Sequence, residues 1–499
     1  MYPHPRFIYI VFILILQYIV DKNRLAVLLF LVLLNILAAF SQALSIFVDE
    51  GQYLLVSKKM LDGWVPYRDI IENKPIGMYI SLIPAVLLCG KDFVKLRLFG
   101  VFIVSLTSFL IFLIGERVKD KKAGLLGALV FILIESFPNL YGYNLLTEPI
   151  ANLFIAALFY MIICAELGYP GALVIGALTA ASCSVKQTSL FVFIPLAFVF
   201  MHASRKLDRK KLLLSFLIGG GIVAVPMLLY LSMSSALGDA IYWNVFSLIR
   251  LGGSTLESKF ESFFVFSFFL FPFVFFALLS LEGTTERMKV VWLWLLSSFI
   301  FVQIGYAWLH NYLFIAPPLS ILAAAGMGGT RRKKRRKDGI WESVFNGIRI
   351  ILFLAVLLLI ISELRMMIEI KKNERVYSFH ASWEEQQEIS EFVSSRTNKE
   401  DGIFVFRNNA EIYYLSDRKP VTRMTFFFWD YFAMMNESEM NEFIIGPLEE
   451  HRPKYFVFNA ADFDAFEETR NSVMVKEYLD SNYELVKKSG PLEVYERKS

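Results

Sequence analysis

The chain has 499 residues, of which 56% are hydrophobic and only 19% are charged, and 48 of them are Phe. Soluble domains carry about a quarter charged residues and do not string together many apolar stretches of about 20 residues. The composition therefore excludes an ordinary soluble protein and predicts a mainly α-helical, polytopic membrane protein. The formal net charge of +4 says little by itself, because the positions of the charges matter more than their sum.

Three basic runs determine the predicted topology. They are GERVKDKKAG at 115–124, HASRKLDRKK at 202–211 and TRRKKRRKDG at 330–339. Apolar segments flank each run, so we interpret the runs as cytoplasmic loops under the positive-inside rule and not as nucleic-acid sites. The membrane spans between these loops must then come in even numbers.

The apolar segments predict eleven spanning helices of roughly the length that a hydrocarbon core of about 30 Å needs. They lie at 25–47, 98–115, 123–139, 149–166, 171–186, 188–202, 212–232, 262–281, 289–309, 312–327 and 345–364. This count places the N-terminus in the cytoplasm and the C-terminal tail outside. The shorter apolar stretch at 76–90 is predicted to lie at the outer interface. The stretch at 7–20 is compatible with a signal-like piece, an interfacial helix or a twelfth span.

The composition changes beyond about Glu363, where charged residues become frequent. Strand-like runs follow at 401–406, 454–459 and 492–497, between charged, helix-like stretches. We predict two domains. Residues 1–365 form the membrane domain, with a functional first outer loop at 48–97, and residues 366–499 form a small extracytoplasmic α/β domain.

The three cysteines, Cys89, Cys164 and Cys183, lie in apolar surroundings and form no CxxC motif or Cys/His cluster. They are most simply small packing residues. The sequence therefore indicates neither a disulfide framework nor a zinc site, and it leaves the need for a divalent metal open.

Polar residues collect in the outer loops of this topology. Ionisable groups at a membrane boundary are costly unless they face water, one another or a ligand. Each has a plainer explanation by itself: an interfacial acid, a lysine that snorkels to the headgroups, a satisfied histidine or a tyrosine of the aromatic belt. Together they predict one site on the outer face. The residues are Asp49, Glu50, Tyr53, Tyr67, Arg68, Asp69, Lys74, Arg97, Glu148, Lys186, Gln187, His310 and Tyr312.

The first outer loop resembles that of the GT-C glycosyltransferases, in the branch related to protein O-mannosyltransferases and to the aminoarabinose transferases of lipid A. DEGQY (49–53), GWVPYRD (63–69) and NKPIG (73–77) carry this resemblance. It extends through Arg97 and LTEP to VKQTS, HNYLFIAPPL and EIYYLSDRKPVTR (411–423), and so covers most of the chain. The chain departs from the family's pattern at Ile76, where a second proline is common, and at Glu148, where Asp is common.

The resemblance implies transfer of a sugar, mannose-like or related, from a polyprenyl- or dolichyl-phosphate carrier to a protein, lipid or glycan acceptor on the outer face. It implies that Asp49 is the general base and that Glu50 is its partner in catalysis. Arg97, Lys186, His310 and Tyr312 are candidates for binding the donor phosphate. Glu148 is a candidate for orienting donor or acceptor. The other candidates for positioning the substrates are Tyr53, Tyr67, Arg68, Asp69, Lys74 and Gln187.

Two other classes of function stay open. A transporter or flippase of lipid-linked saccharides would also be polytopic, although such proteins usually place ionisable residues at helix midpoints and contain inverted repeats. A structural or sensory membrane protein would need no gathering of acids and bases on one face. The donor sugar and the acceptor are not determined by the sequence.

Overall fold

The structure is a computed structural model. It describes residues 24–39, 47–137, 140–165, 168–203, 207–251, 255–282, 284–304, 308–327, 381–427, 429–461 and 469–498. The apolar stretches at 7–20 and 345–364, the basic run at 330–339 and the predicted domain boundary at 365/366 lie outside these residues.

Every predicted span between 25 and 327 overlaps a described helix. Five described helices are long and apolar enough to cross a membrane, and a bent helix pair over 256–279 would make a sixth. The others are shorter, and the predicted count of eleven spans is not established by these helices. The helices are α2 (Arg24–Ala39), α5 (Phe93–Val118), α6 (Lys121–Glu135), α7 (Thr147–Cys164), α8 (Tyr169–Val185), α9 (Phe193–Ala203), α10 (Arg209–Met233), α13 (Leu256–Leu279), α14 (Glu286–Ile304) and α15 (Ala316–Met327).

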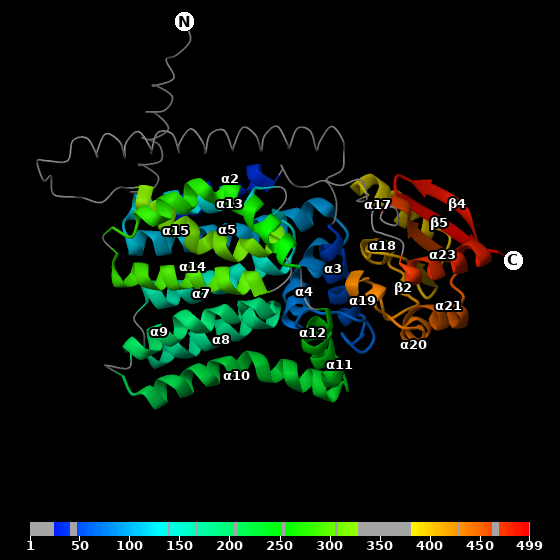
Figure 1. Cartoon of the computed structure of the whole chain (residues 1–499), viewed down its shortest axis with the longest axis horizontal. Coiled ribbons are helices and arrows are strands. Elements are labelled where there is room, and N and C mark those ends of the chain that lie inside the picture. The colour runs from blue at the N-terminus through cyan, green and yellow to red at the C-terminus, as the bar shows by residue number, and fades with distance from the viewer. Residues whose placement is uncertain are drawn as a thin grey trace, which may run out of the picture.

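These helices run side by side as a bundle (Figure 1). Small residues allow the closest contacts: a Cβ on Gly219 of α10 would lie only 1.8 Å from the carbonyl oxygen of Leu173 in α8. Helices in a bilayer gain from such close approach because lipid gives them little hydrophobic drive to associate. The packing places the breaks and ends of several helices at one end of the bundle.

Short elements cover that end. Helices α3 (Val48–Leu61) and α4 (Gly77–Cys89) belong to the first outer loop, and Figure 1 shows them between the bundle and the C-terminal region. The stretch at 76–90 is thus a helix, as predicted, and its interfacial position stays a prediction. The remaining short elements are η2 (Gln187–Val192), α11 (Leu237–Ile241), η3 (Tyr242–Phe246), α12 (Ser247–Leu251) and η4 (Leu309–Ile315).

The C-terminal α/β region, residues 381–498, contains a mixed five-stranded sheet in the order β2-β1-β3-β5-β4. Strand β1 is parallel to β2 and β3, whereas β5 is antiparallel to β3 and β4. The strands are β1 (Gly402–Val405), β2 (Lys419–Pro420), β3 (Tyr455–Asn459), β4 (Tyr483–Ser489) and β5 (Leu492–Arg497). The helices are α17 (Trp383–Ser394), α18 (Glu411–Ser416), α19 (Trp429–Ala433), α20 (Glu437–Met440), η5 (Asn441–Ile445), α21 (Gly446–His451) and α23 (Arg470–Asn482).

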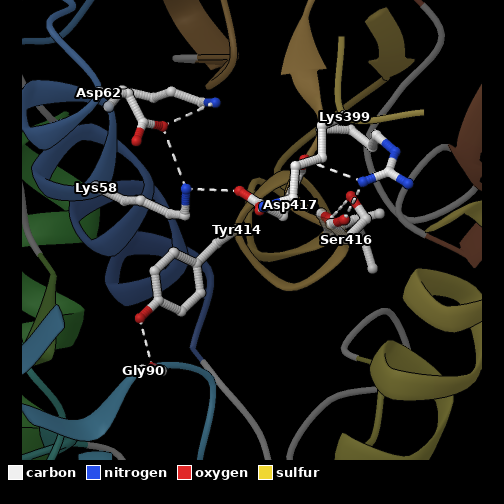
Figure 2. Close-up of polar contacts among 10 residues, drawn as sticks. Lys58, Asp62, Gly90, Lys399, Tyr414, Ser416 and Asp417 are labelled. Carbon is white, nitrogen blue, oxygen red and sulfur yellow. Dashed lines mark hydrogen bonds and ion pairs between the residues drawn. The ribbon is translucent and has the colours of Figure 1, made fainter. Parts of the chain in front are cut away.

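The C-terminal α/β region packs directly against the first outer loop. Figure 2 shows Lys58 of α3 between two carboxylates, with its ammonium 3.2 Å from Asp62 and 2.6 Å from Asp417. The hydroxyl of Tyr414 donates to the carbonyl of Gly90 at 2.6 Å. Partial burial opposes ionisation of Asp417, but the hydrogen bond and charge of Lys58 outweigh it and lower the pKa of Asp417 to about 2. This ionic contact is therefore intact at neutral pH.

Candidate active site at the end of the helix bundle

Asp49 and Glu50 lie in the first turn of α3, where a helix N-terminus favours negative charge. Successive residues of a helix point about 100° apart, so the two carboxylates face different surroundings. Glu50 is fully buried and accepts hydrogen bonds from the backbone NH groups of Phe47 at 3.2 Å and Leu145 at 2.9 Å. It also accepts from the side chains of Asn144 and Arg97. Glu50 thus fastens the start of α3 to the bundle.

Arg97, predicted as a phosphate ligand, lies in the first turns of α5 and is 5% exposed. Its guanidinium pairs with Glu50 and donates to the carbonyl of Tyr143 at 2.9 Å. These contacts join α3, α5 and the segment before α7. They are the contacts of a residue that holds the framework together, and a phosphate role for Arg97 stays a prediction.

Glu148, Lys186 and His310 come together from three separate segments. Glu148 lies in the first turn of α7 and is fully buried, and Lys186 lies in the extended break between α8 and η2. The ammonium of Lys186 contacts both the Glu148 carboxylate and the side-chain oxygen of Asn311. His310, in η4, has its Nε2 3.9 Å from the same carboxylate. The start of α7 and two helix breaks therefore bring one acid, one lysine and one histidine close together.

Asp49 lies within electrostatic range of this cluster. Its charge acts on the Lys186 ammonium and on the His310 imidazole, and so does the charge of Lys74 from the first outer loop. The hydroxyl of Tyr53, one turn along α3 and 3% exposed, interacts with the Asp49 carboxylate. Asp49 itself is half-buried. A partly exposed carboxylate and the Lys74 ammonium thus both lie within electrostatic range of Lys186.

Hydrogen bonds from Tyr67 and Gln187, which were predicted, and from Tyr79, which was not, fix the conformation of the first outer loop near this cluster. The hydroxyls of Tyr67 and Tyr79 donate to the Lys74 carbonyl at 2.7 and 3.3 Å. Gln187 donates to the carbonyl of Asn73 at 2.8 Å. These bonds hold the loop that carries Lys74 against the break at Lys186.

Three predicted residues lie apart from the cluster. Arg68 and Asp69 pair with each other at 2.8 Å, and Arg68 also donates to the carbonyl of Ser234. With Trp64, Arg423, His451 and residues 420–422 they line a cleft of 380 Å³ between the first outer loop and the C-terminal α/β region. Tyr312 stacks on Phe266 and accepts from Gln303, so its contacts lie within the bundle.

One carboxylate in this region, Glu72, was not among the predicted site residues. It is 1% exposed, and burial, opposed by the charge of Lys74, raises its pKa to about 7. The sequence does place an acid directly after two isoleucines, Ile70 and Ile71, in a loop beside Lys74. This is a weak signal, because Asn73 and Lys74 follow at once and the sequence alone does not show that Glu72 is buried.

The arrangement suits the transfer of a group from an anionic leaving group to a hydroxyl. A carboxylate such as Asp49 can take a proton, and Lys186, Lys74 and His310 can stabilise negative charge on a departing phosphate. Among the described residues, no group of three or more His, Cys, Asp or Glu is placed to hold a metal ion.

Comparison with known proteins rests on structure, because no family model and no curated protein matches this sequence. ArnT from Cupriavidus metallidurans superposes with a TM-score of 0.65 when bound to undecaprenyl phosphate and 0.62 in the apo state. The identities are 11% and 13%, and both alignments cover 94% of this chain and 97% of ArnT.

The archaeal oligosaccharyltransferase AglB from Archaeoglobus fulgidus, in complex with an inhibitory peptide and a dolichol-phosphate, superposes with a TM-score of 0.52. The identity is 12%, and the alignment covers 95% of this chain and 74% of AglB. ArnT is an aminoarabinose transferase, and both proteins are membrane glycosyltransferases of the GT-C superfamily. The fold predicted from the first-loop motifs is confirmed: the chain has the GT-C fold.

Proposed function

We propose that the protein is a glycosyltransferase that moves a sugar, mannose-like or related, from a polyprenyl-phosphate carrier to an acceptor on the outer face of the membrane. One observation carries the proposal: Glu148, Lys186 and His310 come together from three segments at one end of the bundle, within electrostatic range of Asp49 and Lys74. The lipids bound to the structural neighbours, undecaprenyl phosphate for ArnT and dolichol-phosphate for AglB, support a lipid-phosphate donor.

Asp49 acts as general base in this reaction. The acceptor hydroxyl attacks the anomeric carbon as its proton passes to the Asp49 carboxylate, and the bond from that carbon to the phosphate oxygen breaks. An alcohol attacks poorly while it keeps its proton, and a positioned carboxylate contributes about 10²–10⁴-fold to such a step. The interaction of Tyr53 with Asp49 orients the carboxylate.

Lys186 stabilises the departing phosphate, and Glu148 holds Lys186 in position. Negative charge grows on the phosphate as it leaves, so a cation fixed beside it acts more strongly in the transition state than on the bound donor. Lys74 adds a second positive charge, and the His310 ring can donate a hydrogen bond to the phosphate. A site at the end of the bundle also lets the donor's lipid tail remain in hydrocarbon while its headgroup reaches the loops.

The test is transfer from a panel of radiolabelled polyprenyl-phosphate sugars by the purified, reconstituted protein. Asp49→Asn keeps the size of the side chain and removes the basic oxygen, so transfer is expected to fall by about two orders of magnitude or more while donor binding persists. Lys186→Ala is expected to lower turnover, with partial recovery in Lys186→Arg.

Lys95→Gln serves as the control, because Lys95 is exposed and its ammonium pairs with Asp92 at the start of its own helix, away from the site. Transfer by Asp49→Asn within a few-fold of the unmodified protein would remove the base assignment. Movement of the lipid-linked sugar across vesicles without release of polyprenyl phosphate would indicate a flippase instead.

A further inference from the structure

The cleft between the first outer loop and the C-terminal α/β region is lined by none of the catalytic candidates Asp49, Lys186 and His310. Its volume of 380 Å³ lies within the range of small-ligand sites, which is about 300–1,000 Å³. One wall comes from the loop, and the other comes from the end of β2, the residues that follow it and the end of α21. A ligand in the cleft would therefore contact both regions at once.

Trp64 gives the cleft an aromatic wall that is held in place. Its indole ring is half-buried, and the Lys59 ammonium lies 5.4 Å from the ring centre. The backbone NH of Trp64 donates to the carbonyl of Lys59 at 2.9 Å, which fixes this residue relative to the end of α3. A pyranose ring presents a face of C–H groups, and the large apolar surface of a tryptophan ring is well suited to contact such a face.

The charged groups of the cleft are balanced in pairs. The Arg68 guanidinium makes two hydrogen bonds of 2.8 Å to the Asp69 carboxylate, and Arg423 contacts Asp239 at 3.2 Å. A carboxylate can accept about four hydrogen bonds and a guanidinium can donate five, so the pair of Arg68 and Asp69 retains capacity for a ligand. Because each guanidinium already has an acidic partner, the cleft suits neutral hydroxyl groups better than phosphates.

The backbone that carries Arg68 and Asp69 forms a strained turn. Tyr67 has a φ of 70°, in the left-handed region that residues with a Cβ rarely adopt. Two hydrogen bonds close the turn: the Asp69 NH donates to the Val65 carbonyl at 2.9 Å, and the Asp69 carboxylate accepts from the Val65 NH at 2.7 Å. The Arg423 guanidinium donates to the Tyr67 carbonyl at 2.9 Å. Strain that the surroundings maintain in this way is concentrated at functional sites.

The sheet edge at the cleft favours a saccharide over a peptide. Strand β2 is an edge strand of the five-stranded sheet, and Pro420 of this strand lines the cleft. Extended peptides often bind to a sheet edge by adding a strand. Pro420 is one of only two residues in β2 and has no NH to donate, so this edge is poorly suited to that mode of binding.

We propose that the cleft binds a neutral pyranose unit of the acceptor, apart from the hydroxyl that receives the new sugar. The inference rests on the proposed function and narrows the acceptor to a molecule that already carries sugar. Tyr67 connects the two places, because its carbonyl accepts from Arg423 at the cleft and its hydroxyl donates to the Lys74 carbonyl. One sugar ring holds the acceptor in the cleft while another part of the acceptor reaches Asp49.

The first test measures binding of neutral di- and trisaccharides of mannose, glucose and galactose to the full-length protein by saturation-transfer NMR, without donor. The protein is placed in lipid nanodiscs, because detergents with sugar headgroups would compete. Trp64→Ala and Arg68→Gln should each weaken binding about ten-fold or more, and Trp64→Phe should retain part of it. Binding by the unmodified protein should change less than about two-fold with ionic strength, since the ligand is neutral.

Arg250→Gln is the matched control for Arg68→Gln. Arg250 is also an exposed arginine that pairs with an acid, Glu439 at 2.8 Å, but it does not line the cleft. This variant should bind the saccharides as the unmodified protein does. Short Ser/Thr peptides are measured alongside as the alternative ligand.

The second test measures sugar transfer by Trp64→Ala. The KM for a saccharide acceptor should rise about ten-fold, while kcat at saturating acceptor, the KM for the donor and the melting temperature stay unchanged. A purely structural role of Trp64 would lower the melting temperature or kcat instead.

Three binding results would each overturn the inference: no binding by any saccharide of the panel, equal binding by Trp64→Ala, or binding of the peptides alone. Strong suppression of binding by salt would indicate an anionic ligand and would also overturn it. Failure of the proposed function gives a different result. In that case the unmodified protein transfers sugar from no donor, although it binds saccharides and loses this binding in Trp64→Ala.

Discussion

The adjacent acids Asp49 and Glu50 show how far residue patterns carry a prediction. The motif DEGQY pointed to both, and the geometry of any backbone requires that they face different ways. The sequence does not reveal which acid faces inward, because that depends on the rotation of α3 against α5. Glu50 pairs with Arg97, whereas Asp49 is half-buried and lies within electrostatic range of Lys186. Glu72 was missed for a similar reason, because its burial depends on how residues 63–77 fold against the bundle.

The pair of Glu50 and Arg97 leads to a prediction about stability. Glu50→Gln removes the negative charge and leaves the buried guanidinium of Arg97 without its ionic partner. Loss of one member of a buried pair typically costs about 3–5 kcal/mol, so the melting temperature in detergent should drop clearly. Donor binding per folded molecule should change little. An unchanged melting temperature would show that the pair contributes nothing to the attachment of α3.

At the scale of elements, the strands that were predicted have either a buried apolar run, as in β1 and β3, or an alternation of apolar and charged residues, as in β5. Residues 401–406, 454–459 and 492–497 correspond to β1, β3 and β5. Strand β4 was missed because YELVKKS shows no regular alternation: its two central apolar residues are adjacent, and four of its seven positions are exposed, as an edge strand can be. Strand β2 has only two residues, one of which is a proline, and this is too short for any periodic signal. The contact between the C-terminal α/β region and α3 was not predictable, because it depends on packing between distant segments.

Gly51 of α3 lies in close contact with α18 of the C-terminal α/β region. A Cβ at this position would lie 2.8 Å from the Cβ of Glu411 and 2.9 Å from its backbone nitrogen. Gly51→Ala should therefore push α18 away from α3, at a cost typical of overpacking of about 1–3 kcal/mol, and reduce sugar transfer.

Gly238→Ala is the matched control. Gly238 also lies in a helix, but nothing is within 4 Å of an added Cβ, so alanine should be neutral or slightly stabilising. Melting temperature and transfer rate would be measured for both variants. If Gly51→Ala behaved like Gly238→Ala, the close packing of α3 on α18 would not matter for the site.

At the scale of the whole molecule, the fold class was predictable because hydropathy and basic loops constrain a membrane protein strongly. The number of spans was not, because several helices of the bundle are short or broken. The breaks that blur the hydropathy signal, at Lys186 and His310, are also the places where the site's ionisable groups enter.

The predicted orientation can be checked with reporter fusions. A run of seven basic residues from Arg331 to Lys337 is costly to translocate in a short loop, so a reporter fused after Lys337 should read cytoplasmic. A reporter at the C-terminus should read extracytoplasmic. Alkaline phosphatase activity from the fusion after Lys337 would invalidate the predicted topology, and a fusion after Lys211 provides an independent cytoplasmic reference.

The contact of Thr425 with Gln52 has a consequence for how the protein is assembled during its synthesis. The Thr425 hydroxyl donates to Gln52 at 3.0 Å, and Ile71 donates to the carbonyl of Arg423, so residues near the end of the chain complete a site whose base lies near its start. The ribosome synthesises α3, which carries the base, long before it synthesises the segment around Thr425. A nascent chain can therefore insert its helices into the bilayer while it is still unable to transfer sugar. The lipid-linked donor is then not consumed before the enzyme is complete. A chain truncated before Glu411 should insert normally and be inactive, and activity in such a truncation would refute this order of assembly.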